Sequence, residues 1–473
     1  MTAGTDTVRV GLFGIGLETY WGQFPGLRER LEGYIARIRT NLGGADVISA
    51  GLVDTVDKAH EAAALFRSHD AKLVFLYVST YALSSTVLPA VRNLPVVVLN
   101  LQPERAIDYA RFNALGDRGK MTGEWLAYCQ ACAVPEIASV FHRAGIPFRQ
   151  VTGTLDDPEA WEEIRGWVDA ARTAAILAST TLGILGHYYN GMLDVYCDPT
   201  QIATSFGTHI EHLEMGELVL LRNQVTREEA EIKEKEFSRE FEVLAVCPPE
   251  EITRAARTAC ALDRLVTRRR LGALAYYYEG TPGSEEEDIM TSVIAGNSLL
   301  TANHVPVAGE CEVKNAVAMK IMDAFGAGGS FSEFYAMDFN DQVMLLGHDG
   351  PGHLAIAEGK PTLKPLGVYH GKPGKGLSVE MNVKHGPVTL LAVVQTGKGT
   401  LKLLAAEGES VSGPVLEIGN TNSRYRFPLS VKQFVEEWSR EGPAHHCAIG
   451  VGHIAPRLRN LASLLNLEFA QVC

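Results

Sequence analysis

The fold class is indicated by the run Val8-Arg9-Val10-Gly11-Leu12-Phe13-Gly14-Ile15-Gly16, which leads directly into a long amphipathic stretch. An apolar strand that ends in glycines and passes into a helix is the repeating unit of a parallel α/β sheet. Further apolar runs predict strands at 47–53, 73–78, 96–101 and 137–141, and amphipathic stretches predict helices at 20–42, 58–69 and 156–177. Because the strands are almost continuously apolar, helices should cover both faces of the sheet.

Two further segments differ from the first in their patterns of charged, apolar, glycine and proline residues. Residues 176–325 contain a charged, solvated helix at 227–243, an alanine-rich helix at 251–265 and a strand at 273–278, which predict a second α/β domain. After Gly326, glycine and proline separate short runs at 388–394, 401–404 and 415–418, as in antiparallel strands, and a helix follows at 431–436. We therefore predict an α/β protein with two successive parallel-sheet (Rossmann-like) domains, 1–175 and 176–325, and a C-terminal antiparallel β-barrel domain with a terminal helix, 326–473.

Composition and charge exclude several classes of protein. The 473 residues are 46% hydrophobic and 21% charged, which is typical of a folded globular chain rather than a disordered or fibrous one. Asp and Glu (56) outnumber Lys and Arg (43), so the net charge of -13 argues against nucleic acids and membranes as partners. No secretory leader pattern precedes the first strand, and a cytoplasmic location is expected.

Two short motifs carry little weight. The glycines at 11–16 do not follow the GxGxxG order of a dinucleotide-binding turn, and Asp54 lies too far along the chain to bind a ribose. Cys129 and Cys132 form a CxxC pair, but no second pair completes a zinc site. We interpret the glycines as a strand–helix turn and the thiols as packing residues. An NAD-dependent oxidoreductase remains an alternative function.

A stronger constellation lies in the second half of the chain, at Glu310, Glu333, His348 and the pair His445-His446. Two carboxylates and two imidazoles from four places could bind one divalent ion, and Mn²⁺, Co²⁺ or Mg²⁺ suits these donors at least as well as Zn²⁺. Each residue also has a structural explanation. Glu310 opens a helix predicted at 311–325, where a carboxylate stabilises the helix dipole, and the two histidines could meet only water. Spacing alone leaves both explanations open.

These residues lie in the runs Gly309-Glu310, Met319–Met322, Gly328–Tyr335, Leu346–His348 and Ala444–His446. Together the runs resemble the metal-site framework of the L-arabinose isomerase family, within the wider L-fucose and L-arabinose isomerase group. The resemblance follows the order of the chain and is most specific from Gly309 onward. The architecture that it implies, two α/β domains and a C-terminal β-barrel, agrees with the domains predicted from the sequence pattern.

The resemblance implies roles for four residues. Glu310, Glu333, His348 and His446 would ligate an ion of the Mn²⁺ type, and Co²⁺ or Mg²⁺ would also suit. Glu310 and Glu333 would move protons between C1 and C2 of an aldose through a cis-enediol, with no organic cofactor. This chemistry requires a base and an acid beside a charge-stabilising ion, which the four side chains supply.

The sugar pocket is where this chain departs from the family. A carboxylate, Glu18, replaces a neutral amide, and Cys132 stands where the family has a sugar-contacting histidine. His353 could replace that histidine, although a surface position in a tight turn is the simpler interpretation. The residues predicted to contact substrate are Glu18, Tyr278, Tyr335, His353 and His445.

The resemblance also implies a homo-oligomer, a hexamer or trimer, in which subunit interfaces complete the sites and Glu18 faces a partner. The function predicted from the sequence is a metal-dependent isomerase of a free sugar, of the L-arabinose/L-ribulose or D-galactose/D-tagatose type. Two alternatives beside the oxidoreductase are an isomerase of L-fucose or D-arabinose type sugars and a sugar-binding protein without activity. Because the pocket residues differ from those of the family, the sequence leaves the choice of sugar open.

Overall fold

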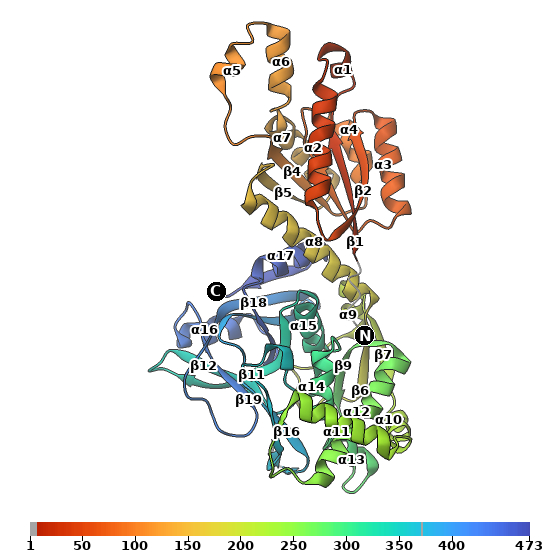
Figure 1. The fold of residues 1–473 in the computed structure, drawn as a ribbon, viewed down its shortest axis with the longest axis vertical. Coiled ribbons are helices and arrows are strands. Elements are labelled where there is room, and N and C mark those ends of the chain that lie inside the picture. Colours follow the sequence, from red (N-terminus) through yellow and green to blue (C-terminus); the bar gives the residue numbers. More distant parts are fainter. Residues whose placement is uncertain (1–6, 370–371) are drawn as a thin grey trace. The chain divides into compact units, whose positions relative to one another are not determined.

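The protein is described here by a computed structural model, which covers residues 7–369 and 372–473 (Figure 1). The described residues form two compact units, 7–175 and 176–473, and the boundary between them falls within helix α8 (Pro158–Ser179). The predicted domain limit at residue 325 lies inside the second unit, where residues on both sides of it share one hydrophobic core. Within the described residues, no helix is both long enough and apolar enough to cross a membrane.

The N-terminal unit is built on a five-stranded parallel sheet in the order β2-β1-β3-β4-β5. Its strands are β1 (Val8–Ile15), β2 (Ala45–Val53), β3 (Leu73–Tyr77), β4 (Val96–Gln102) and β5 (Phe148–Thr154). Its helices are α1 (Thr19–Gln23), α2 (Leu27–Asn41), α3 (Val56–Ser68), α4 (Ser84–Val91), α5 (Tyr109–Asn113), α6 (Arg118–Leu126) and α7 (Gln130–Ala144), before α8. The predicted parallel sheet is confirmed.

Two predictions for this unit were wrong in detail. Residues 137–141 lie inside α7 and not in a strand, because Ala133, Ile137 and Phe141 recur every four residues and bury one helical face. The fifth strand is β5, in which Val151 is the one buried residue, so that it gives little apolar signal. The predicted helix 20–42 is divided into α1 and α2, since the chain turns at Gly26 with a left-handed φ of 82°.

The glycines of β1 serve packing. Gly11 and Gly14 lie within the strand, and side chains from helices occupy the places where their Cβ atoms would stand. The ring of Trp21 lies 2.7 Å from the Cβ position of Gly16, and its Nε1 donates to Asp54 Oδ2 at 2.7 Å. These glycines therefore allow neighbouring side chains to pack closely against β1 and the turn that follows it.

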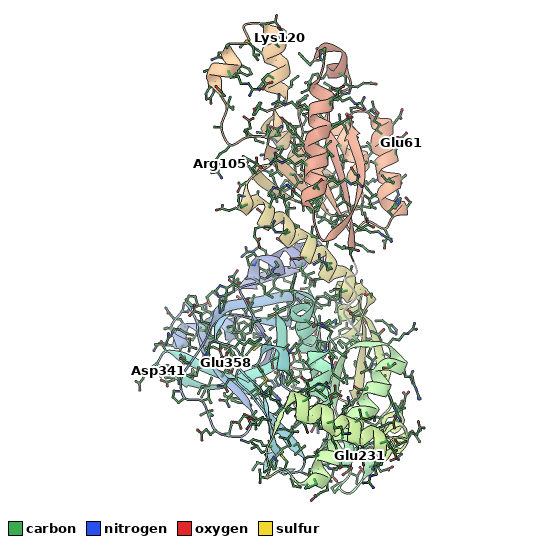
Figure 2. All side chains as sticks on the ribbon, viewed as in Figure 1. Glu61, Arg105, Lys120, Glu231, Asp341 and Glu358 are labelled. Carbon is green, nitrogen blue, oxygen red and sulfur yellow. The ribbon has the colours of Figure 1, made fainter. Side chains whose placement is uncertain are left out.

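The second unit begins with a four-stranded parallel sheet in the order β10-β9-β6-β7. Its strands are β6 (Thr181–Gly186), β7 (His209–Leu213), β9 (Leu271–Tyr277) and β10 (Val307–Ala308). The helices are α9 (Pro199–Phe206), α10 (Met215–Asn223), α11 (Arg227–Glu240), α12 (Pro249–Arg269), α13 (Glu285–Met290), α14 (Ile294–Ala302) and α15 (Val313–Ala324). The charged helix is confirmed as α11, and it carries the exposed Glu231 on its outer side (Figure 2).

The C-terminal part of this unit is a closed antiparallel barrel of six strands, as predicted. The strands follow the order β17-β20-β11-β12-β19-β18, and pairing of β18 with β17 closes the ring. They are β11 (Gly328–Asp338), β12 (Val343–His348), β17 (Gly386–Gln395), β18 (Leu401–Val411), β19 (Thr421–Arg426) and β20 (His446–Val451), and β21 (Glu468–Gln471) adds to β18 in parallel. The predicted strand 415–418 was wrong: these residues form a loop, in which Ile418 is exposed and does not face the core.

The remaining elements surround the barrel. They are β8 (Glu242–Val243), β13 (Thr362–Pro365) and β16 (Leu377–Glu380) in one small sheet, β14 (Val368–Tyr369) paired with β15 (Lys372–Pro373), the 3-10 turn Leu354–Ile356, and helices α16 (Val431–Arg440) and α17 (Ala455–Leu464). Because β8 of the central segment pairs with β13 of the C-terminal segment, these two segments share a small sheet as well as a core.

Candidate active site

The predicted metal ligands converge in the second unit, where the central sheet meets the barrel. Glu310 follows β10, whereas Glu333, His348 and His446 lie on the neighbouring barrel strands β11, β12 and β20. The strand register places Glu333 directly opposite His446 on β20 and opposite Gly347, the neighbour of His348, on β12. Residues far apart in the sequence are therefore brought together by the antiparallel pairing of three strands.

The donor atoms form two overlapping groups. Glu310, His348 and His446 each offer one donor atom within 4.8 Å of the others, and so do Glu333, His445 and His446. Glu310 Oε2 lies 3.4 Å from His446 Nε2 and 3.6 Å from His445 Nε2, while Glu333 Oε2 lies 4.0 Å from His445 Nε2. All five predicted residues thus surround one small space.

Glu310 itself does not open a helix, contrary to the sequence prediction. Helix α15 begins at Val313, and Glu310 and Cys311 both adopt left-handed backbone conformations, with φ of 52° and 60°. Such conformations are costly for residues other than glycine and occur at sites that need a particular side-chain direction. The turn is held by a hydrogen bond from Cys311 N to Tyr276 O at 2.9 Å. This turn aims the Glu310 carboxylate at the histidines.

A carboxylate that sequence reasoning missed holds His446. Glu312 Oε2 lies 2.6 Å from His446 Nδ1, and both side chains are almost fully buried. Because a carboxylate only accepts hydrogen bonds, Nδ1 carries the proton and Nε2 is left to face Glu310. The ring of Phe331 packs at 4.4 Å from the rings of both His348 and His446. The sequence feature that could have identified Glu312 was its position as a second acidic residue two positions after Glu310.

The second missed carboxylate is Asp194, which holds His445. Asp194 Oδ2 accepts from the backbone N of His445 at 3.0 Å and lies 2.6 Å from its Nδ1. The Glu310 carboxylate raises the pKa of His445 to about 9. Partial burial opposes this rise, and the Asp194 carboxylate adds to it. Partial burial opposes ionisation of Asp194, but the hydrogen bonds from His445 lower its pKa to about 2. Nothing in the sequence around Asp194 pointed to this contact.

Both predicted pocket tyrosines lie in the second unit. Tyr335 is on β11, two residues after Glu333, and its hydroxyl accepts from Asn420 Nδ2 at 2.9 Å. Burial, and then the charge of Glu333, raise the pKa of Tyr335. Tyr278 follows β9 with its ring 5.8 Å from that of His187, and it lines a cavity of about 380 Å³ together with Tyr276 and other, largely apolar side chains. Burial raises the pKa of Tyr276 to about 12, and the charge of Glu310 contributes to this shift.

His353 is buried, so the simpler interpretation of a surface histidine was wrong. Burial lowers its pKa to about 4, and the groups that act on it include Asp323, at the C-terminal end of α15, and His304, which follows α14 and contacts Asp323 at 2.7 Å. Glu312 immediately precedes the opposite, N-terminal end of this 12-residue helix, which is about 18 Å long. The charged groups that act on His353 are therefore those near Asp323 and not the carboxylates of the metal-ligand cluster.

Glu18 belongs to the N-terminal unit, where it is exposed and immediately precedes α1. The four predicted metal ligands belong to the other compact unit. The prediction that Glu18 contacts a sugar, like the predicted subunit interfaces, stays a prediction.

The cluster fits a divalent cation by the chemistry of its donors. Glu310 Oε2 and His446 Nε2 are buried, lie 3.4 Å apart and have no hydrogen-bond partner among the described residues. A buried carboxylate oxygen and a buried imidazole nitrogen that face each other without a hydrogen bond are costly unless a further group binds them. Oxygen and nitrogen donors at this separation suit an ion of the Mn²⁺, Co²⁺ or Zn²⁺ type.

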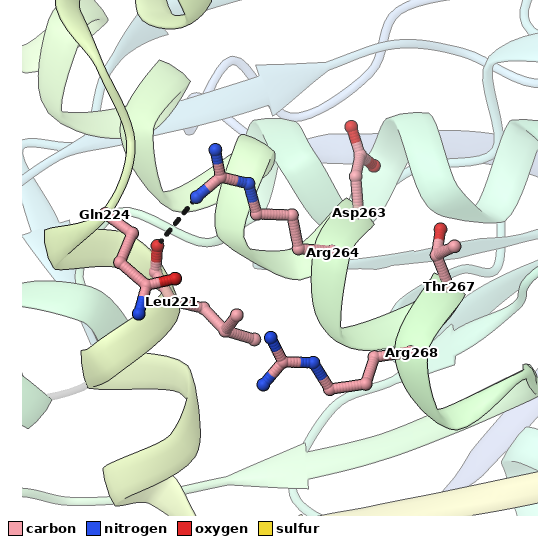
Figure 3. A pocket seen from close by; sticks show the side chains of 6 residues that line it. All are labelled: Leu221, Gln224, Asp263, Arg264, Thr267 and Arg268. Carbon is pink, nitrogen blue, oxygen red and sulfur yellow. Dashed lines mark hydrogen bonds between the residues drawn. The ribbon is translucent and has the colours of Figure 1, made fainter.

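Another pocket lies apart from these residues, between α10 and α12 (Figure 3). Its volume is about 540 Å³, and two arginines, Arg264 and Arg268, line it. Arg264 pairs with Glu229 at 2.5 Å and Arg268 with Glu217 at 3.5 Å, so their charges are already compensated. None of the predicted site residues lines this pocket.

Comparisons with known proteins match the barrel most specifically. Residues 328–468 match the family model of the L-arabinose isomerase C-terminal domain. The chain is similar to L-arabinose isomerases from Nocardioides sp. (23% identity over 71% of this chain and 68% of the relative) and Serratia proteamaculans (22%, 67% and 65%). It is also similar to the enzyme of Bacillus subtilis (21% identity over 70% of this chain and 68% of the relative). The matched regions thus span about two thirds of the length of these relatives.

Proposed function

The chain is a divergent member of the L-arabinose isomerase family, and from this premise we propose that it is a metal-dependent aldose–ketose isomerase. The proposed substrate is a free aldose of the L-arabinose or D-galactose type, converted to L-ribulose or D-tagatose. The observation that supports this proposal most directly is the convergence of two carboxylates and three imidazoles on one small space.

The reaction moves one proton from C2 of the aldose to C1 and a second proton from the C2 hydroxyl to O1, so that the carbonyl passes from C1 to C2. It needs one group that removes the proton beside the carbonyl and one that delivers a proton to the neighbouring carbon, by way of a cis-enediol. Glu310 and Glu333 flank the same imidazole, His445, at 3.6 Å and 4.0 Å, so their carboxylates can act on the two carbons of one bound substrate. The same two groups exchange roles in the reverse direction.

Glu310, Glu333, His348 and His446 are the residues that would hold the ion. When bound, a Mn²⁺-type ion supplies Lewis-acid stabilisation of the charge that develops on the two sugar oxygens. The protein contributes fixed ligand directions, through Glu312 at His446 and through the Phe331 ring. Such outer contacts commonly set metal affinity.

Tyr335 and Tyr278 are proposed to line the sugar pocket, and the chain is proposed to act as a cytoplasmic homo-oligomer. An isomerase of the L-fucose or D-arabinose type is the nearest alternative, since the pocket residues rather than the ligands decide the sugar. A binding protein without activity is disfavoured, because both carboxylates face the imidazoles. The order of the glycines at 11–16, which is not GxGxxG, disfavours an NAD-dependent oxidoreductase.

The test is a panel assay on protein stripped of metal and reloaded with Mn²⁺. L-arabinose, D-galactose, L-fucose, D-arabinose and their epimers are incubated, and ketose formation is measured with and without chelator. We expect turnover of one sugar series that is lost with chelator. Formation of no ketose from any of these sugars by Mn²⁺-loaded protein would refute the proposal.

A variant test addresses the acid–base role. Glu333→Gln removes the charge but keeps the size of the side chain, and we expect kcat to fall by about 10²- to 10⁴-fold. The matched control is Glu468→Gln, which removes one charge from an exposed position on β21. Circular dichroism checks that both variants fold, and activity of Glu333→Gln near that of the control would contradict the assigned role.

A further inference from the structure

The segment 187–198, between β6 and α9, is attached to the candidate site at several points. It begins after Gly186, whose φ of 95° is left-handed and whose Cβ position lies only 1.9 Å from Tyr277 O, so no larger residue fits there. Tyr189 N donates to Glu310 O at 3.4 Å, and the rings of Tyr189 and Tyr277 lie 4.6 Å apart. The segment is therefore guided from the end of β6 toward the Glu310 turn.

A buried lysine clamps the same segment. Lys314, on the first turn of α15, donates from Nζ to Asp194 O at 2.6 Å and to Tyr196 O at 3.2 Å. Its charge is compensated by Glu312, with Oε1 at 3.7 Å, and Lys314 is almost fully buried. A buried ammonium group is tolerated only with such partners. Lys314 therefore fixes the backbone of Asp194 relative to α15, which Glu312 precedes.

The fixed backbone places the Asp194 carboxylate against one edge of the His445 ring. The same oxygen, Oδ2, accepts the backbone N–H of His445 at 3.0 Å and lies 2.6 Å from Nδ1. With Nδ1 occupied in this way, the other ring nitrogen points to the carboxylates, 3.6 Å from Glu310 and 4.0 Å from Glu333. The side chain of His445 is 37% exposed, so a ligand can reach the ring.

We propose that Asp194 is a positioning residue for the isomerase reaction: it orients His445 so that Nε2 hydrogen-bonds an oxygen of the bound sugar between Glu310 and Glu333. This inference rests on the proposed function. His445 is then a substrate-contacting group and not a metal ligand, and the two adjacent histidines have different tasks. Each is oriented by its own carboxylate, His445 by Asp194 and His446 by Glu312.

The experiment compares Asp194→Asn, His445→Gln and the double variant with the parent protein and with Glu468→Gln. The first readout is Mn²⁺ affinity by calorimetry, which we expect to be unchanged in all variants because neither residue ligates the ion. The second readout is kcat/KM on the best aldose, which each single variant should lower by about 10- to 100-fold. The double variant should be no worse than His445→Gln alone, because Asp194 acts through His445.

Asp194→Glu keeps the carboxylate and should restore part of the activity that Asp194→Asn loses. Additive losses in the double variant, an unchanged kcat/KM in Asp194→Asn, or a loss of Mn²⁺ affinity in either single variant would overturn the inference.

Binding of L-arabinitol, an open-chain polyol that cannot react, is measured in parallel by calorimetry. If the parent binds the polyol without turning over any aldose, the proposed function fails, and weaker polyol binding by Asp194→Asn still supports the positioning role. If the parent neither binds the polyol nor turns over an aldose, both the proposed function and this inference are refuted.

Discussion

The contact between Glu312 and His446 provides a sharp test of how this site is organised. Glu312 Oε2 and His446 Nδ1 are 2.6 Å apart, and the side chains are 2% and 0% exposed. A hydrogen bond to a charged group in such surroundings contributes about 1.5 to 3 kcal/mol. Glu312→Gln keeps the volume but replaces the charge by an amide, which can also donate to Nδ1. The ring then loses its preference for presenting an unprotonated Nε2 to Glu310.

The expected consequence is weaker Mn²⁺ binding. Loss of a carboxylate that orients a ligating histidine lowers metal affinity by about 10- to 100-fold, which corresponds to about 1.4 to 2.7 kcal/mol. Glu312→Ala should do more harm, since it leaves Nδ1 and the nearby Lys314 without a carboxylate, and removal of one partner of a buried pair costs about 3 to 5 kcal/mol.

The assay is calorimetric titration of Mn²⁺ into metal-stripped protein, with urea unfolding to report stability. Glu468→Gln serves as the control for loss of one negative charge, and Glu312→Asp tests whether the charge or the reach of the side chain matters. A Mn²⁺ dissociation constant for folded Glu312→Gln within twofold of the parent value would refute the reasoning, because His446 would then be oriented without Glu312.

Two further predictions concern stability. Because burial lowers the pKa of His353 to about 4, the unfolded state binds more protons between pH 4 and 6.5. The free energy of unfolding should therefore fall by up to about 3 kcal/mol as the pH drops through this window, and His353→Leu should remove this part of the pH dependence in urea titrations. Gly347→Ala would place a Cβ 1.8 Å from Thr421 O on the paired strand, and we expect a loss of at least about 1 to 3 kcal/mol together with weaker Mn²⁺ binding. Gly397→Ala, where a Cβ meets nothing within 4 Å, is the control, and equal thermal unfolding midpoints for the two alanine variants would contradict the clash.

Most elements of the fold could be predicted where local pattern and burial agree. The apolar runs that became β1, β3 and β4 are buried on both faces, and their boundaries were close to the predicted ones. The wrong strand predictions concerned apolar runs that form a helix or a loop in the structure. Residues 137–141 bury one face of α7, whereas 415–418 form a loop tied to Asn422 through the backbone of Leu416. Short apolar runs have the same appearance in strands and helices, and only the packing partners distinguish them.

In the candidate site, too, some features could be predicted from the sequence and others could not. Glu310, Glu333, His348 and His446 were selected from residue type and family resemblance, and the structure brings them together. The prediction that Glu310 opens a helix was wrong, because Glu310 lies in a left-handed turn before α15. Only a glycine would have indicated such a turn in the sequence. His353 illustrates the opposite case, since its position in a turn-forming sequence suggested a surface site, whereas the structure buries it.

The sequence by itself determined the order of two parallel α/β segments and a β-barrel, the acidic charge of the chain and the residues proposed as metal ligands. The segment order and the charge reside in residue types and short-range periodicity, whereas the ligands were selected from residue types together with the family resemblance. Only the tertiary structure decided that Glu312 holds His446 and that Asp194 holds His445, across 134 and 251 positions of sequence. Contacts over such separations depend on strand register, on closure of the barrel and on the buried Lys314, because these fix where the backbones of distant segments meet.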